Sequence, residues 1–296
     1  MLRRFQFIFC VVTLFALGVS ICACHRGETL APDLPRTVDG VTMRDVLFFS
    51  TALNREMPYR VYLPSRIDAG QKFPVVYLLH GNGGSYREWS NHTDAAQFAL
   101  KGWIVVMPEG KSSYYVNSAT VAQDRYEDYV IHDLVADVEA RFPAKSDRAS
   151  RAIIGISMGG FAALELGLTH PEMFGFAGGI SPAIDATERP FNWRRIDRWW
   201  AFRRTFGPSG SGQRRAHDPF LLAQSADLNA VPYLYLTVGD SEPLLEPNER
   251  FAARLKQRGF AYEFHVKPGR HDWKQWDAQI PGCFEALVKK VPVKSS

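Results

Sequence analysis

The sequence predicts an α/β protein in which a mostly parallel, twisted sheet is covered by helices on both faces. Two observations support this prediction. Five near-continuous apolar runs of strand length recur along the chain, and segments with helical periodicity lie between them. Strands that are apolar on both faces are typical of a sheet buried between helices. The alternation of strand and helix favours βαβ units and therefore parallel strands.

The expected strands can be located along the chain. Residues 43–50 and 57–64 alternate or run apolar over strand length, so we expect an antiparallel hairpin at the start of the fold. The five buried strands are expected in FPVVYLLHG, GWIVVMPEG, RAIIGIS, FGFAGGIS and VPYLYLTVG, each of which ends in Gly, Ser or a Gly-containing turn. The short stretch AYEFHV, residues 261–266, is interpreted as one more strand.

Helical periodicity appears in five segments: DAAQFAL, YEDYVIHDLVADVEARF, MGGFAALELGLTH, EPNERFAARLKQRG and WDAQIPGCFEALVKKV. In the second segment the apolar residues can share an inward face. We therefore expect Glu127, Asp133 and Asp137 to be solvated charges on its outer face rather than an acid pair.

One segment interrupts this alternation. Residues 185–217 are rich in Trp and Arg and end in a Gly/Ser stretch, which indicates a lid-like insertion in a domain that runs from residue 41 to 296. Its arginines are interpreted either as a solvated surface or as a patch that meets an anionic substrate or lipid head group. Its aromatic side chains can face a phenolic, glycan or acyl chain, or pack among themselves.

The first residues have the pattern of an export signal. Two arginines precede a long uncharged apolar run, so residues 1–23 are predicted to be a signal peptide or lipoprotein signal, followed by a linker over 24–40. ICAC at the end of the run resembles a bacterial lipobox, in which Cys24 would be lipidated and tether the protein to a membrane. It departs from the usual pattern at Cys22. The alternatives are plain cleavage and an uncleaved anchor. All three predict an exported domain, periplasmic or extracellular.

Composition excludes several classes of protein. The chain is 46% hydrophobic and 22% charged, which is ordinary for a globular protein, and its net charge of +4 is too small to indicate nucleic-acid binding. Three of the four cysteines lie in the export segment, so Cys283 is expected to form no intrachain disulfide. Without a CxxC pair or a His cluster at ligand spacing, we expect neither a metal nor a cofactor.

A candidate nucleophile lies at the junction of a predicted strand and a predicted helix. Residues 155–159, Gly-Ile-Ser-Met-Gly, have the form G-x-S-x-G, and this context is typical of a nucleophile elbow that presents Ser157. Glycines are needed on either side because the neighbouring backbone approaches too closely for side chains. The alternative is a glycine-rich turn with an idle serine.

A serine hydroxyl needs a base, and the base needs a carboxylate partner, both later in the chain. His271 lies in a loop after the last predicted strand, the place expected for the base. Asp240 and Glu242 both follow the strand that ends at Gly239. Glu242 is favoured because, in hydrolases of this kind, the acid usually stands three residues after that glycine. Asp240 is the alternative acid, although it can instead cap the turn.

The remaining element is an oxyanion hole. HGNGG, residues 80–84, follows the first buried strand and can bring a backbone N–H group to the serine. The amide of Asn82 and the amide of Met158, the residue after the serine, are the predicted donors. The alternative is a turn whose glycines serve only backbone freedom.

In these segments the chain resembles the esterase D / feruloyl esterase family of α/β-hydrolases, which also includes S-formylglutathione hydrolases, tributyrin esterases and secreted mycolyl-transferring antigens. The resemblance rests on residues 75–89, 126–143, 151–181, 238–259 and 268–276. It implies an α/β-hydrolase catalytic domain over 41–296, with Ser157 as nucleophile, His271 as base and Glu242 as acid. Most members carry Asp where this chain has Glu242.

The sequence therefore predicts a serine hydrolase that cleaves carboxylic esters, small-molecule or glycan, through an acyl-enzyme on Ser157. An acyltransferase is the first alternative, because it would share the acyl-enzyme and pass the acyl group to a sugar or lipid rather than to water. A non-catalytic binding protein on the same fold is the second alternative, for which a broken triad would be expected.

Overall fold

The computed structural model describes residues 32–189, 194 and 196–291. The chain from Asp33 onward forms one compact unit. The predicted signal over 1–23 and Cys24 lie outside the described residues. Within the described part, none of the helices has both the length and the apolar character that crossing a membrane would require.

The strands form one eight-stranded sheet with the order β1-β2-β4-β3-β5-β6-β7-β8. They are β1 (Val41–Ser50), β2 (Arg55–Pro64), β3 (Val75–Leu79), β4 (Ile104–Pro108), β5 (Arg151–Ile156), β6 (Phe176–Ile180), β7 (Tyr233–Gly239) and β8 (Tyr262–Lys267). The antiparallel hairpin is β1–β2, and β2 also runs antiparallel to β4. All other neighbours are parallel. The predicted strands and the mostly parallel sheet are confirmed.

Helices connect these strands and lie on both faces of the sheet. They are α1 (Glu88–His92), α2 (Ala96–Leu100), α3 (Tyr126–Asp128), the π-helical η1 (Tyr129–Leu134), α4 (Val135–Arg141), the 3-10 turn η2 (Arg148–Ser150), α5 (Met158–Thr169), α6 (Ile196–Phe206), α7 (Gly212–Ala216), α8 (Pro219–Ser225), α9 (Leu245–Arg258) and α10 (Trp273–Lys290). The five segments with helical periodicity correspond to α2, to α3 with η1 and α4, to α5, to α9 and to α10.

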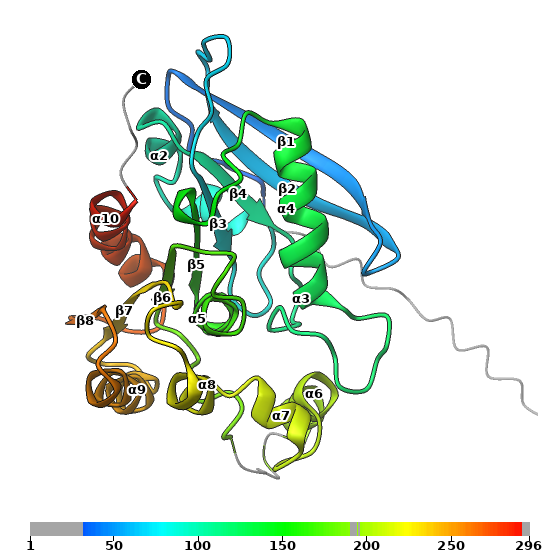
Figure 1. Cartoon of the computed structure of the whole chain (residues 1–296), viewed down its shortest axis with the longest axis vertical. Coiled ribbons are helices and arrows are strands. Elements are labelled where there is room, and N and C mark those ends of the chain that lie inside the picture. The colour runs from blue at the N-terminus through cyan, green and yellow to red at the C-terminus, as the bar shows by residue number, and fades with distance from the viewer. Residues whose placement is uncertain (1–31, 190–193, 195, 292–296) are drawn as a thin grey trace, which may run out of the picture. The chain divides into compact units, whose positions relative to one another are not determined.

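The helices pack into two hydrophobic cores, one on each face of the sheet (Figure 1). One core joins η1, α4, α5 and α9 to side chains such as Val75, Tyr77 and Leu79 of β3. The other joins α1, α2 and α10 to the alternate residues, Val76 and Leu78. Because successive side chains of a strand point to opposite faces, β3 is buried on both. Parallel strands covered in this way place their carboxyl ends at one edge, where functional sites of open α/β sheets lie.

Asp133 and Asp137 are not the solvated charges that we expected. Asp133 Oδ2 accepts a hydrogen bond from Ser50 Oγ (2.6 Å), and Asp137 Oδ2 accepts one from Tyr59 Oη (2.7 Å). Both donors belong to the β1–β2 hairpin, which covers this side of η1 and α4. The expectation is wrong because these contacts come from residues more than 70 positions earlier, which helical periodicity does not report.

The insertion over 185–217 contains α6 and α7, and its described residues are divided between core and surface. Phe202 and Phe206 are buried, with ring centroids 5.5 and 5.2 Å from that of Tyr114. Trp200, by contrast, is 57% exposed. The insertion is therefore anchored to the domain by aromatic packing and also presents an aromatic side chain to solvent.

Candidate active site

Ser157 occupies a strained turn between β5 and α5. Its backbone has φ 55° and ψ −109°, a conformation that costs a non-glycine residue on the order of 1–3 kcal/mol. The flanking glycines are required by close packing. A Cβ at Gly155 would lie 2.1 Å from the carbonyl oxygen of Gly159, and a Cβ at Gly159 would lie 2.3 Å from that of Leu79. The G-x-S-x-G spacing is thus a steric consequence of the strand–turn–helix junction.

His271 and Glu242 converge on this serine from the loops after β8 and β7. His271 Nε2 lies 2.9 Å from Ser157 Oγ, and its Nδ1 is hydrogen-bonded to Glu242 Oε2. Because an ionised carboxylate only accepts, Nδ1 carries the ring proton and Nε2 is free to accept the serine hydroxyl. The Glu242 side chain is fully buried, whereas that of His271 is 30% exposed. A substrate can therefore reach the imidazole but not the carboxylate.

The two candidate acids have different surroundings. Glu242 Oε1 accepts hydrogen bonds from Ser181 Oγ and from the Gly239 amide, both at 2.6 Å, which fixes its carboxylate behind the imidazole. Asp240 is exposed and accepts from the Gly269 amide at 3.1 Å. That hydrogen bond lowers the pKa of Asp240. The structure thus places Glu242 against His271 and Asp240 in the turn beside it.

The loop over 80–84 lies against the elbow. A Cβ at Gly81 would be 3.7 Å from Ser157 Cβ. The Gly110 amide donates to His80 Nε2 (2.9 Å), so His80 Nδ1 carries the proton and donates to the Gly81 carbonyl oxygen (2.7 Å). In a trans peptide the carbonyl and the following N–H point in opposite directions. The His80 ring therefore also fixes the direction of the Asn82 N–H.

Met158 supplies the second predicted amide. It is the first residue of α5, and the first N–H groups of a helix have no intrahelical acceptor. The positive end of the helix dipole lies at the same point. The site therefore combines a serine hydroxyl, an imidazole hydrogen-bonded to it, and helix and loop amides beside it. Such an arrangement can stabilise an oxyanion during nucleophilic attack.

Two further residues of the site were not singled out from the sequence. Ser181, which holds Glu242, ends the FGFAGGIS run and adopts φ 45°. Trp276 on α10 packs edge to face against the His271 ring, with centroids 4.9 Å apart. The only sequence signal for Ser181 was its place at the end of a buried strand. The only signal for Trp276 was its place within the PGRHDWKQW block.

A second set of Glu–His contacts surrounds the carboxyl-terminal half of α5. His217 Nδ1 lies 2.8 Å from Glu165 Oε1, and His170 Nε2 lies 2.7 Å from Glu127 Oε1. Burial lowers the pKa of each histidine, but the hydrogen bond and charge of its glutamate outweigh burial and raise it overall. Glu127 is only 8% exposed, so the expectation that it is solvated is wrong. It is buried because the end of α5 brings His170 to it.

In the described part of the chain, no three His, Cys, Asp or Glu side chains are grouped so as to hold a metal ion. Cys283 is free and buried in α10, with its sulfur packed close to Gly178. Burial raises the pKa of its thiol. Cys283 is therefore a core residue rather than a nucleophile.

Comparison with known proteins gives consistent matches. The family model Esterase, described as "Putative esterase", matches residues 50–287. The chain is 24% identical over 226 residues to an acetyl esterase from Caldicellulosiruptor saccharolyticus, covering 74% of this chain and 85% of the relative. It is also 24% identical over 255 residues to the diacylglycerol acyltransferase/mycolyltransferase Ag85B of Mycobacterium leprae, covering 72% of this chain and 75% of the relative.

A solved structure shows the same fold. The S-formylglutathione hydrolase from Agrobacterium tumefaciens aligns with a TM-score of 0.74 at 20% identity, covering 87% of this chain and 98% of that one. The resemblance to the esterase D / feruloyl esterase family is therefore confirmed. With a family match across most of its length and the sheet described above, the chain belongs to the esterase family of α/β-hydrolases and is a carboxylic ester hydrolase.

Proposed function

We propose that the protein cleaves carboxylic esters through an acyl-enzyme on Ser157. The observation that carries this proposal is the continuous chain of contacts from Ser157 Oγ through His271 to the buried Glu242 carboxylate. A serine hydroxyl is a weak nucleophile alone and becomes reactive when a base accepts its proton as it attacks.

The proposed reaction has two stages. Ser157 Oγ attacks the ester carbonyl while His271 Nε2 takes the hydroxyl proton, and Glu242 stabilises the imidazolium that forms. The amides of Asn82 and Met158 hold the negative oxygen of the tetrahedral intermediate. His271 then gives its proton to the leaving alcohol. Water, deprotonated by the same imidazole, attacks the acyl-enzyme, and Ser157 leaves with a proton as the free acid is released.

The test is hydrolysis of p-nitrophenyl acetate and butyrate by Ser157→Ala. We expect kcat/KM to fall by roughly 10⁴-fold or more, because the nucleophile is lost, while the melting temperature stays at or above that of wild type. The strained turn remains, and alanine fits wherever serine does. An unchanged rate would contradict the proposal, and so would failure of wild type to react with a fluorophosphonate probe.

An acyltransferase is the second candidate, supported by the similarity to the diacylglycerol acyltransferase/mycolyltransferase Ag85B. Both activities would share the acyl-enzyme and differ in whether water or an alcohol attacks it. Product analysis with and without a sugar or glycerol acceptor distinguishes them. A hydrolase releases free acid in both cases, whereas a transferase yields a new ester when the acceptor is present. A small-molecule or glycan ester is the proposed substrate, supported by the acetyl esterase relative.

We also propose that the domain is exported, either freed by cleavage or tethered through a lipidated Cys24. The support is the sequence of residues 1–23, two arginines followed by an uncharged apolar run. Cell fractionation of the full chain and of Cys24→Ser tests both parts. A tether predicts a membrane-bound wild type and loss of the lipid in the variant. Recovery of the unprocessed wild-type chain from the cytoplasm would overturn export.

A further inference from the structure

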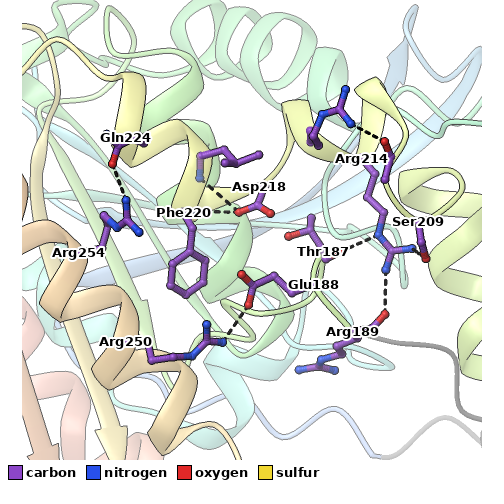
Figure 2. Close-up of a pocket in the computed structure, with 13 residues that line it drawn as sticks. Thr187, Glu188, Arg189, Ser209, Arg214, Asp218, Phe220, Gln224, Arg250 and Arg254 are labelled. Carbon is purple, nitrogen blue, oxygen red and sulfur yellow. Dashed lines mark hydrogen bonds and ion pairs between the residues drawn. The ribbon is translucent and has the colours of Figure 1, made fainter.

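A cavity of about 540 Å³ lies between the insertion and helices α8 and α9 (Figure 2). Its walls come from the loop 187–189, from residues 209–218, and from these two helices. Neither the three residues of the candidate triad nor the loop 80–84 lines it. The volume is within the range of small-molecule sites. This cavity is therefore separate in its residues from the candidate active site.

The lining carries an excess of positive charge. The charged residues are Arg189, Arg214, Arg215, Arg250 and Arg254 against Glu188 and Asp218. Both carboxylates are already engaged. Glu188 Oε2 pairs with Arg250 at 2.9 Å, and Asp218 Oδ1 accepts from the Phe220 amide at 2.9 Å as the cap of α8. Burial also raises the pKa of Asp218.

Arg214 is the most enclosed of these cations, with 3% of its surface exposed. Its guanidinium donates to the Thr187 carbonyl (2.7 Å), to Ser209 Oγ (3.2 Å) and to the Arg189 carbonyl (3.3 Å), all of them uncharged acceptors. Burial lowers its pKa despite the charge of Asp218 nearby. A buried cation without a counterion is costly, so an anion in the cavity would offset that cost.

Two more guanidinium groups also donate only to uncharged acceptors, although Arg215 is exposed and Arg254 is half-buried. Arg215 donates to the Gly210 carbonyl and Arg254 to Gln224 Oε1, both at 2.5 Å. Among the residues that the structure describes, no carboxylate lies within ion-pair distance of Arg214, Arg215 or Arg254. Figure 2 shows Arg254 and Arg214 on opposite sides of the cavity. Arginines of the insertion and of α9 therefore bring positive charge to the cavity from two sides.

We propose that this cavity binds a phosphate monoester, held between the insertion and α9 by Arg214, Arg215 and Arg254. Guanidinium groups pair well with phosphate oxygens, and a phosphate monoester carries three acceptor oxygens and close to two negative charges. The cavity exceeds the size of phosphate itself. Phe220, whose ring lies 5.0 Å from the Arg250 guanidinium carbon, provides an apolar wall for the organic part of the ligand.

The test compares two double variants by isothermal titration calorimetry. Arg215→Gln/Arg254→Gln removes two guanidinium groups of the cavity, and Arg44→Gln/Arg66→Gln removes the same charge from exposed positions outside it. One probe is glycerol 3-phosphate, and the other is vesicles of phosphatidylcholine containing phosphatidic acid, so that a free ester and a lipid head group are separated. Arg214 is kept because its loss would disturb the insertion.

We expect wild type and the control double variant to bind at least one probe saturably. We expect Arg215→Gln/Arg254→Gln to bind it at least about tenfold more weakly, because charged hydrogen bonds are lost. Ser157→Ala should bind as wild type does, so this result does not depend on the proposed hydrolysis. The proposal is overturned if wild type binds neither probe, or if both double variants lose affinity equally.

Discussion

A Glu–His contact lies near each end of helix α5, and the two contacts have different consequences. At its amino-terminal end, Glu242 holds His271, whose other ring nitrogen meets Ser157. Toward its carboxyl-terminal end, Glu165 holds His217, and among the described residues the imidazole has no hydrogen bond to a serine or cysteine side chain. The His271 side chain is 30% exposed and that of His217 is 11% exposed. A Glu–His contact is therefore no sign of catalysis by itself. A nucleophile and access for substrate distinguish the first from the second.

The largest effect on turnover is expected when the carboxylate that holds His271 is replaced. We expect Glu242→Gln to lower kcat for p-nitrophenyl butyrate by roughly 10⁴-fold, because an amide no longer stabilises the imidazolium or enforces the tautomer. Asp240→Asn, two residues away in the same turn, is the matched control and should stay within a few-fold of wild type. Equal losses in the two variants, or a larger loss in Asp240→Asn, would show that the acid is misassigned.

Replacing the imidazole at the other end should change stability and leave turnover intact. We expect His217→Gln to lower the free energy of unfolding by about 1.5–3 kcal/mol at pH 6, since it removes a charged hydrogen bond to buried Glu165. His132→Gln, at an exposed position of η1, is the control and should change little. Urea unfolding with a parallel kcat measurement gives both quantities.

The same variant has a defined pH dependence. The pKa of His217 is raised in the folded state, so its stabilisation is fully present below the unfolded value, about 6.5, and is lost as pH rises through the folded value. The difference between wild type and His217→Gln should therefore be larger at pH 6 than at pH 9. A difference that does not vary with pH would mean that the contact is not an ion pair.

The sequence predicted those parts of the molecule that backbone geometry imposes. The five central strands, β3 to β7, were found because burial on both faces leaves a continuous apolar run. Ser157 was found because its turn tolerates only glycine at positions 155 and 159. The partners that the structure brings to Ser157 followed from chain order, which the fold fixes.

Contacts made by long side chains across the fold left no such pattern. Glu127 was expected to be solvated because helical periodicity cannot show that His170 returns to it. Ser181 was overlooked because its partner lies 61 residues away. For the arginines of the insertion, the sequence left open whether they form a solvated surface or meet an anionic ligand, since nothing local indicates that Arg214 is buried.

The hydrogen bond from Arg214 to the Thr187 carbonyl has a consequence for protein engineering. It joins two points 27 residues apart, near the beginning and the end of the insertion. With both ends fastened at one junction, the segment between them forms a closed loop, and lengthening a closed loop costs little additional entropy. The junction is thus a suitable point at which to replace the segment without altering the strands of the sheet, provided that the packing of Phe202 and Phe206 on Tyr114 is kept.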